Sequence, residues 1–188
     1  MTRIFRIWNG FLEHWDILDR YGNKTGRTII RGKKGLSKGE YHLVVHIWVI
    51  NSKGEFLIQR RSDTKPLMPG EWAATGGSAF AGEGSRPAAL RELREELGIH
   101  VTRRRMVHVK RQLRKYSLND IYAVRCNIPA EKCKLQKDEV AEVKWVSLDE
   151  LKRMVENGEY HNYGKNYFEI IYSIDEFLKR NKRNYHND

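Results

Sequence analysis

The alternation of apolar and polar residues predicts several short strands in the first part of the chain. Four segments show this pattern, or the enrichment in β-branched and aromatic residues that strands favour: 15–19, 27–31, 41–50 and 55–61. Tyr21-Gly22-Asn23 and Asn51–Gly54 are typical of turns. Segment 27–31 is therefore expected to pair with 15–19, and segment 55–61 with 41–50. The glycine-rich basic residues 32–39 and the proline-containing residues 62–71 are predicted loops.

A helical pattern follows between residues 85 and 98. Four apolar residues recur at the spacing that places side chains on one helical face: Ala89, Leu90, Leu93 and Leu97. Ser85 is expected to cap this helix and Gly98 to end it. Ser147 is expected to cap a second helix that runs to about Val155. Further strands are expected near 72–78, 105–114, 119–127 and 143–146.

These elements interleave without a regular alternation of strand and helix, which favours a mixed α/β sandwich over a doubly wound parallel sheet. No repeat, low-complexity segment or linker divides the chain, so a single domain is expected over residues 1–188. Within it we expect an N-terminal strand extension over about 1–40 and a C-terminal helix over about 165–180. Either of these parts is a candidate surface for a homodimer.

The composition indicates a folded domain with an affinity for anions. Of the 188 residues, 40% are hydrophobic and 31% are charged, which is too apolar for general disorder. No apolar run reaches the roughly 20 residues that span a bilayer, and the first residues lack the apolar stretch of a signal peptide. We therefore expect a cytoplasmic protein without a membrane partner. The net charge of +11 favours acidic partners such as nucleotides, other diphosphates or RNA.

Three glutamates of the predicted helix share one face. Glu92, Glu95 and Glu96 are three and four residues apart, so their side chains lie on the same side of a helix. Carboxylates this close repel one another unless a cation lies among them. Oxygen-rich ligand sets suit Mg²⁺ or Mn²⁺, and such ions commonly bridge to substrate phosphates. The pattern therefore predicts a divalent-metal site that accepts a diphosphate.

Neighbouring residues strengthen this interpretation. The pair Gly76-Gly77 lets the backbone approach a metal or phosphate closely, because no side chain intervenes. Arg91 is placed to hold an adjacent carboxylate by a charge-assisted hydrogen bond. Taken alone, the charged run at residues 91–96 would be typical of a solvated helix face with internal ion pairs.

The charged run does not stand alone. One segment joins these residues in a single register: Gly77-x5-Glu83-x7-Arg91-Glu92-Leu93-x-Glu95-Glu96-x-Gly98-Ile99. It resembles the Nudix box, and the resemblance to Nudix hydrolases (MutT-like proteins) covers about residues 13–177. This resemblance implies an α/β/α sandwich with a mixed sheet and a loop–helix–loop box. It also implies metal-dependent hydrolysis of a diphosphate linkage, as in nucleoside diphosphate derivatives.

The resemblance implies roles for individual residues. The expected metal ligands are Glu92, Glu95, Glu96 and Gly76. The expected catalytic residues are Glu92, Glu95 and Glu139. Glu92 is the first candidate for the general base, and a loop glutamate is the second. In the downstream loop Glu142 is the alternative to Glu139, and a surface position for both residues is the competing interpretation.

A narrower resemblance links the flanking stretches 13–22, 41–51 and 59–72 to the branch of the family that contains isopentenyl-diphosphate isomerase. By this comparison Arg61 and Lys65 are expected to contact the substrate phosphates. The isomerase has a cysteine and histidines at the start of the box region, whereas residues 75–79 here contain neither. The resemblance therefore favours a hydrolase. Isomerase activity and a nucleotide- or RNA-binding module are the alternatives.

Two other groups of residues have open interpretations. The basic residues within 103–115 either line a substrate cleft, contact a nucleic-acid backbone or form a solvated strand face. Four aromatic residues are candidates for stacking on a base, although each is more often a core residue: Tyr116, Tyr122, Trp145 and Tyr163.

Overall fold

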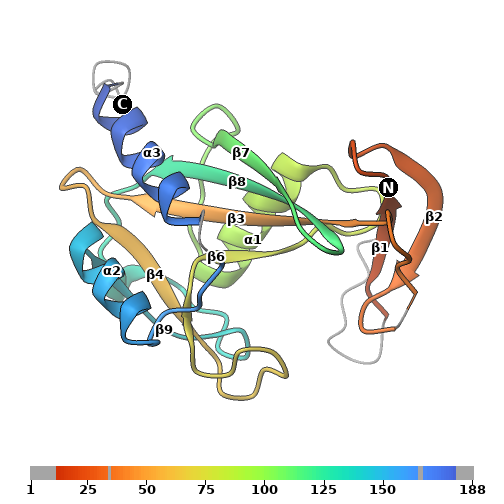
Figure 1. Ribbon diagram of the computed structural model, residues 1–188. Coiled ribbons are helices and arrows are strands. Elements are labelled where there is room, and N and C mark those ends of the chain that lie inside the picture. Colours follow the sequence, from red (N-terminus) through yellow and green to blue (C-terminus); the bar gives the residue numbers. More distant parts are fainter. Residues whose placement is uncertain (1–11, 34, 165–166, 181–188) are drawn as a thin grey trace.

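The computed structural model describes residues 12–33, 35–164 and 167–180. Seven strands form one sheet: β3 (His42–Ile50), β4 (Phe56–Arg61), β5 (Trp72–Ala73), β6 (Thr75–Ser78), β7 (Val107–Leu113), β8 (Ser117–Arg125) and β9 (Val140–Val146). The main path of this sheet runs β5-β4-β3-β8-β7, while β6 pairs with β3 and β9 pairs with β4 (Figure 1). A separate hairpin consists of β1 (His14–Leu18) and β2 (Lys24–Ile30).

β3 is the centre of the large sheet. It pairs in parallel with β8 along its whole length, from His42 opposite Ser117 to Ile50 opposite Arg125. Its other edge pairs antiparallel with β6 and, at its end, with β4. The last six residues of β3 are all buried, as its run of apolar and β-branched residues predicted.

Helices cover both faces of this sheet. Leu93 and Leu97 of α1 (Ser85–Leu97) pack with Ile47 and Val49 on one face. On the other face α2 (Leu148–Glu156) and α3 (Tyr167–Arg180) pack over the neighbouring β3 residues, including Trp48. Successive side chains of β3 thus pack alternately into the two hydrophobic cores, one on each face of the sheet. The expected α/β/α sandwich with a mixed sheet is confirmed.

Of the three helix ends predicted from the sequence, two are confirmed. Gly98 ends α1 with a φ of 68°, and the Ser147 hydroxyl accepts a hydrogen bond from the Glu150 amide, as expected. The predicted cap at Ser85 is wrong. The N-cap is Gly84, which makes no side-chain hydrogen bond, and the Ser85 hydroxyl is hydrogen-bonded to the Tyr122 hydroxyl at 2.9 Å instead.

The predicted strand over 72–78 is interrupted at Ala74. Before that residue β5 pairs with β4, and after it β6 pairs with β3, so the chain changes its partner there. The predicted C-terminal helix begins at residue 165, which lies outside the described residues. From Tyr167 to Arg180 the chain is helical. In the described ranges no helix combines the length and the apolar character needed to cross a membrane.

The β1–β2 hairpin lies beside the main sheet, at the right of Figure 1. Leu18 forms an isolated bridge with Tyr41, and the Trp15 ring stacks on His42 with 4.2 Å between ring centroids. The Gly82 amide donates a hydrogen bond to the Asp16 carboxylate at 2.8 Å. These contacts fix the hairpin next to the start of α1, where it closes one side of the cavity described next.

Candidate active site

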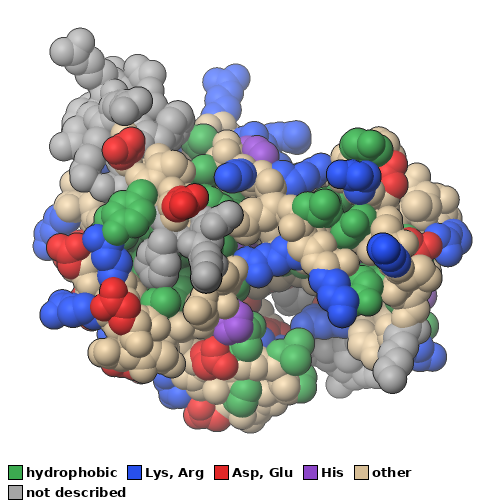
Figure 2. Space-filling model, in the orientation of Figure 1, with side chains coloured by type: hydrophobic (Ala, Val, Ile, Leu, Met, Phe, Trp, Pro, Cys, Tyr) green, Lys and Arg blue, Asp and Glu red, His purple; other side chains and the backbone are tan. Residues whose placement is uncertain are grey.

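A cavity of about 480 Å³ opens between α1, the β3–β6 edge, the loop 62–71 and the ends of the β1–β2 hairpin. Figure 2 shows the molecule hollowed between the hairpin and the main body, with Lys and Arg side chains around the opening. The cavity is lined by Glu13, Arg31, Val44, His46, Arg61, Lys65, Pro66, Leu67, Met68, Ala74, Gly76, Gly77, Ser78, Phe80, Arg91, Glu92, Glu95, Glu96, Gln136, Glu139 and Tyr163.

Glu96 lies at the bottom of this cavity, with a relative exposure of only 4%. One of its carboxylate oxygens accepts hydrogen bonds from the Gln59 side-chain amide at 3.0 Å and from the Gly76 backbone N–H at 3.2 Å. The Thr75 hydroxyl in turn donates to Gln59 at 3.1 Å, which fixes the orientation of that amide. Burial raises the pKa of Glu96 to about 8, because its charge has lost most of its water.

Glu92 lies directly over the backbone of Gly77. A Cβ atom at Gly77 would come within 2.5 Å of a Glu92 carboxylate oxygen, so any larger residue there would displace the end of this side chain. Burial raises the pKa of Glu92 to about 7, although the adjacent Arg91 opposes the shift. Two carboxyls of the box are therefore held where a second positive charge would stabilise their ionised forms.

Arg91 organises the acidic residues around it. Its Nη1 donates to Glu92 at 2.7 Å and to Glu95 at 3.1 Å, while its Nε donates to Glu83 at 3.0 Å. The side chain is only 7% exposed, and its guanidinium lies 3.9 Å from the centre of the Phe80 ring. Arg91 thus fixes the positions of three carboxylates through charge-assisted hydrogen bonds, the role that the sequence suggested for it.

These carboxylates fit a divalent cation in their chemistry. They supply hard oxygen ligands, and two of them are buried with raised pKa values, as expected where a cation belongs. Across the part of the chain that the structure describes, no three His, Cys, Asp or Glu side chains form a ready-made ion site. Arg91 bridges Glu92 and Glu95, so an ion at this position requires the glutamates to rotate toward the cavity.

The three predicted residues outside the box lie in the same cavity. Lys65 and Glu139 form an ion pair with 2.6 Å between Nζ and the carboxylate oxygen. Arg61 is held by a hydrogen bond of 3.1 Å from its Nε to the Leu67 carbonyl. The alternative residue Glu142 lies elsewhere: it is 57% exposed and pairs with Arg60 at 3.7 Å. Of the two downstream glutamates, Glu139 is the one beside the box.

The cavity also contains residues that the sequence did not indicate as functional. Glu13 and Arg31, at the open ends of the β1–β2 hairpin, form an ion pair of 2.8 Å. A charged pair on a hairpin has the pattern of a solvated surface, and only the packing of the hairpin places it here. Of the four aromatic candidates for stacking, only Tyr163 lies in the lining, whereas Trp145 donates its N–H to the Ile128 carbonyl at 3.1 Å.

The residues in the stretch that differs from the isomerase, and the histidines near it, make other contacts in this structure. Thr75 is completely buried and bonded to Gln59, and Gly77 leaves no room for a side chain beside Glu92. His42 is stacked on Trp15, and burial lowers its pKa to about 4. His46 lines the cavity, but its Nδ1 is hydrogen-bonded to the Tyr167 hydroxyl at 2.8 Å.

Comparisons with known proteins agree with this geometry. The family model of the NUDIX domain matches residues 40–165. A Listeria monocytogenes protein named an uncharacterized Nudix hydrolase is 37% identical over 159 residues, which cover 81% of this chain and 90% of that protein. Isopentenyl-diphosphate Delta-isomerase of Shigella dysenteriae is 27% identical over 150 residues, covering 77% of this chain and 82% of that enzyme.

Among solved structures, the fold is similar to that of DR0079 from Deinococcus radiodurans. The two structures superpose with a TM-score of 0.70, covering 86% of this chain and 98% of that one. Their sequences are 21% identical, so the comparison concerns the fold alone.

Proposed function

This chain belongs to the Nudix hydrolase family, and from that premise we propose that it is a divalent-metal-dependent pyrophosphohydrolase acting on a small diphosphate. The observation that carries the proposal is the meeting of two kinds of residue in one cavity. The box glutamates Glu92 and Glu96 and the cations Arg61 and Lys65 all line it, and Glu96 is almost completely buried. A magnesium or manganese diphosphate matches both, because its metal suits the carboxylates and its phosphates suit the cations.

The positions of the side chains suggest which residues bind the metal, which bind the phosphates and which accept the proton. A divalent ion, when bound by Glu92, Glu95 and Glu96, would neutralise charge on the phosphates. Arg61 and Lys65 bind phosphate oxygens and orient the phosphorus for attack by water. Glu92 is the proposed acceptor of the water proton, with Glu139 as the second candidate. The P–O bond to the leaving phosphate breaks as the water oxygen bonds to phosphorus, which yields two phosphorylated products or a monophosphate and phosphate.

The Lys65–Glu139 ion pair adds a coupling between substrate binding and proton transfer. With 2.6 Å between its charged atoms, Lys65 is committed to Glu139 in the substrate-free protein. A phosphate that takes over Lys65 leaves Glu139 without its partner and able to accept a proton or join the metal ligands. We therefore propose that substrate binding itself prepares Glu139 for its role.

The substrate class is a small molecule such as a nucleoside diphosphate derivative. A cavity of about 480 Å³ is within the usual range for sites that enclose small ligands. The net charge of +11 favours capture of any anion, so charge alone does not distinguish nucleotides from RNA. A cavity of this size favours the small molecule.

The test is hydrolysis of a panel of diphosphates with Mg²⁺, with Mn²⁺ and with a chelator. The panel contains nucleotide sugars, ADP-ribose, nucleoside di- and triphosphates and triphosphorylated RNA, with a coupled phosphatase to reveal phosphorylated products. We expect turnover that requires metal and falls at least about 100-fold in Glu96→Gln, in line with the loss of a metal-binding or proton-transferring group. Glu139→Gln should reduce turnover, whereas the matched control Glu142→Gln on the exposed side of β9 should not. Metal-independent turnover, or full activity of Glu96→Gln, would contradict the proposal.

Isomerase activity is the second candidate, because the chain is also similar to isopentenyl-diphosphate isomerase. It would appear in the same panel as double-bond migration in isopentenyl diphosphate without phosphate release, followed by NMR. The buried Thr75 and the space taken by Glu92 at Gly77 predict that no migration occurs. Migration by the wild-type protein would replace the hydrolase proposal.

A further inference from the structure

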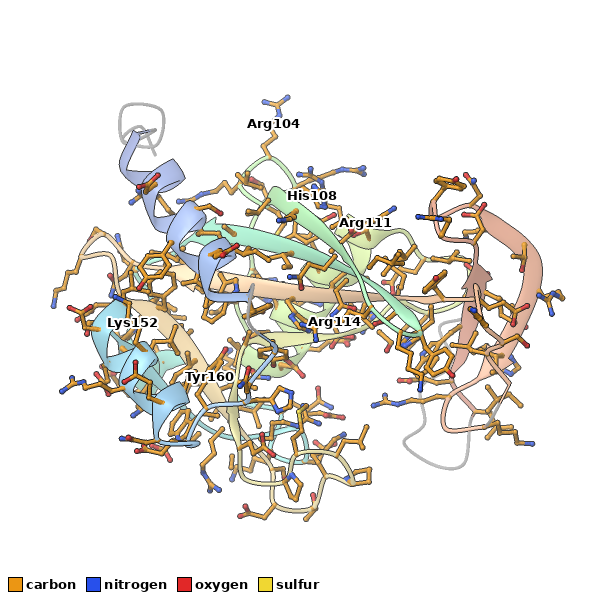
Figure 3. The ribbon with its side chains drawn as sticks, viewed as in Figure 1. Arg104, His108, Arg111, Arg114, Lys152 and Tyr160 are labelled. Atoms are coloured by element: carbon orange, nitrogen blue, oxygen red, sulfur yellow. The ribbon has the colours of Figure 1, made fainter. Side chains whose placement is uncertain are left out.

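The segment between α2 and α3 carries a tyrosine, Tyr163, whose position is fixed from several sides. Arg114, at the end of β7 and labelled in Figure 3, donates a hydrogen bond to the Tyr163 carbonyl. The Tyr163 ring packs against the rings of His46 at 4.7 Å and Tyr167 at 4.5 Å between centroids. Its backbone neighbour Gly164 accepts a hydrogen bond from the Tyr167 amide at 3.0 Å, at the start of α3. This tyrosine is held as firmly as a core residue.

Tyr163 nevertheless differs from the two tyrosines beside it. Tyr160 and Tyr167 have relative exposures of 2% and 3%, and both belong to the core between the sheet and α3. The hydroxyl of Tyr167 is used by His46, at 2.8 Å from its Nδ1. Tyr163 is partly accessible and forms part of the cavity lining, so of these three tyrosines it is the one that faces the site.

Tyr163 lines the same cavity as Arg61 and Glu96. The charges of both residues act on the pKa of its hydroxyl, and so does a hydrogen bond with the backbone N–H of Ala74. Burial dominates and raises the pKa of this phenol above its ordinary value, so the hydroxyl keeps its proton under any working condition. The cavity lining thus contains both a neutral O–H donor and Arg61, the residue proposed to hold a phosphate.

We propose that Tyr163 is a substrate-contacting residue, whose hydroxyl donates a hydrogen bond to the phosphate held by Arg61. This inference rests on the proposed diphosphate substrate and adds a residue far from the Nudix box in sequence. The contact is to the ground-state phosphate, so its loss should weaken binding more than it slows the chemical step. His46 and Arg114 are positioning residues in this arrangement, because they hold the ring and the backbone of Tyr163 in place.

The test is Tyr163→Phe, which removes the hydroxyl and keeps the ring, beside the matched control Tyr160→Phe. Binding of imidodiphosphate, a diphosphate analogue that resists hydrolysis, is measured by calorimetry with Mg²⁺ present. KM and kcat are measured with the best substrate of the panel, and the melting temperature is measured for each variant. We expect Tyr163→Phe to weaken analogue binding and raise KM about tenfold, which is the loss of one hydrogen bond to a charged group. Its kcat and melting temperature should stay near wild type, and Tyr160→Phe should leave both KM and analogue binding unchanged.

The outcomes separate this inference from the proposed function. If the wild-type protein turns over a diphosphate while Tyr163→Phe keeps its KM and analogue affinity, the contact does not exist and the hydrolase proposal stands. A fall in kcat with unchanged affinity would also overturn the contact as described. If no diphosphate is hydrolysed, the proposed function fails, and tenfold weaker analogue binding by Tyr163→Phe alone would still establish the contact.

Discussion

Two adjacent glycines in β6 have different physical requirements. A Cβ atom at Gly76 would lie 2.2 Å from the backbone carbonyl oxygen of Val45, in the neighbouring strand β3. A Cβ atom at Gly77 would lie 2.5 Å from the carboxylate of Glu92. A strand backbone inside a sheet has little freedom to move, whereas the end of a glutamate side chain can rotate away. The absence of a side chain is therefore required by the fold at Gly76 and by the position of Glu92 at Gly77.

The variants Gly76→Ala and Gly77→Ala should separate these two requirements. We expect Gly76→Ala to lose about 1–3 kcal/mol of unfolding free energy, because its methyl group forces β6 away from β3. Gly77→Ala should keep a melting temperature near that of wild type but lose metal-dependent turnover, because Glu92 is displaced. Thermal denaturation and a metal titration of activity measure both effects. Equal loss of stability in the two variants would show that the glutamate is as immobile as the strand.

The spacing of the box predicted which glutamates meet, because helical geometry alone brings residues three and four apart to one side. It did not predict that Glu96 is buried and bonded to Gln59, since that contact joins two elements far apart in sequence. Tyr163 was one of four equivalent aromatic candidates for the same reason. Local periodicity carries no information about which loop lies over which strand.

The β1–β2 hairpin is a small element with a large effect on the site. Its two open ends meet through a hydrogen bond of 2.8 Å from the Arg31 amide to the Glu13 carbonyl. Their side chains form an ion pair that lines the cavity, as the Lys65–Glu139 ion pair also does. The cavity is thus flanked by two such pairs, each of which offers one cation to an anionic ligand.

Arg31→Met should therefore raise the KM for the diphosphate substrate, by about tenfold for a lost charge-assisted contact. Arg27→Met is a matched control, because Arg27 lies on β2 of the same hairpin and pairs with Glu40 away from the cavity. Steady-state kinetics of both variants, with melting temperatures as a check on folding, decide the matter. Similar KM values for the two variants would mean that the hairpin only supports the fold.

At the level of elements, the sequence predicted most strands and helices but few of their partners. The apolar run of β3 shows that the strand is buried on both faces, yet such a run does not distinguish a parallel from an antiparallel neighbour. The pairing with β8 joins residues far apart in the sequence, which local periodicity does not report. The change of partner at Ala74 was missed because residues 72–78 have one continuous strand-like pattern.

For the molecule as a whole, the buried carboxyls make stability depend on pH. Burial raises the pKa of Glu92 to about 7 and that of Glu96 to about 8, from an ordinary value of 4.5. At a pH between 4.5 and these raised pKa values, the folded protein binds protons that the unfolded chain has already released. This contribution favours folding at low pH and is lost as the pH rises from about 5 through about 8, with each pKa unit worth about 1.4 kcal/mol.

The metal-free protein should consequently melt at a lower temperature at pH 8 than at pH 6. Glu96→Gln removes one of the two titrating groups, so in chelator at pH 8 we expect it to be more stable than wild type, with a weaker dependence on pH. Addition of Mg²⁺ should raise the melting temperature of wild type more than that of Glu96→Gln. Glu142→Gln, an exposed substitution, should follow wild type throughout. Parallel melting curves for Glu96→Gln and wild type across this pH range would refute the account.

The parallel pairing of β3 with β8 has a consequence for how the chain is made. A ribosome releases β3 long before β8, because β4, β5, β6, α1 and β7 all lie between them in the sequence. One long apolar edge of β3 must therefore wait unpaired during synthesis, when it is open to aggregation or to a chaperone. Tyr163 emerges later still. The glutamates of α1 are therefore made before β8, but the cavity that they line is assembled only after Glu139 and Tyr163 have been made.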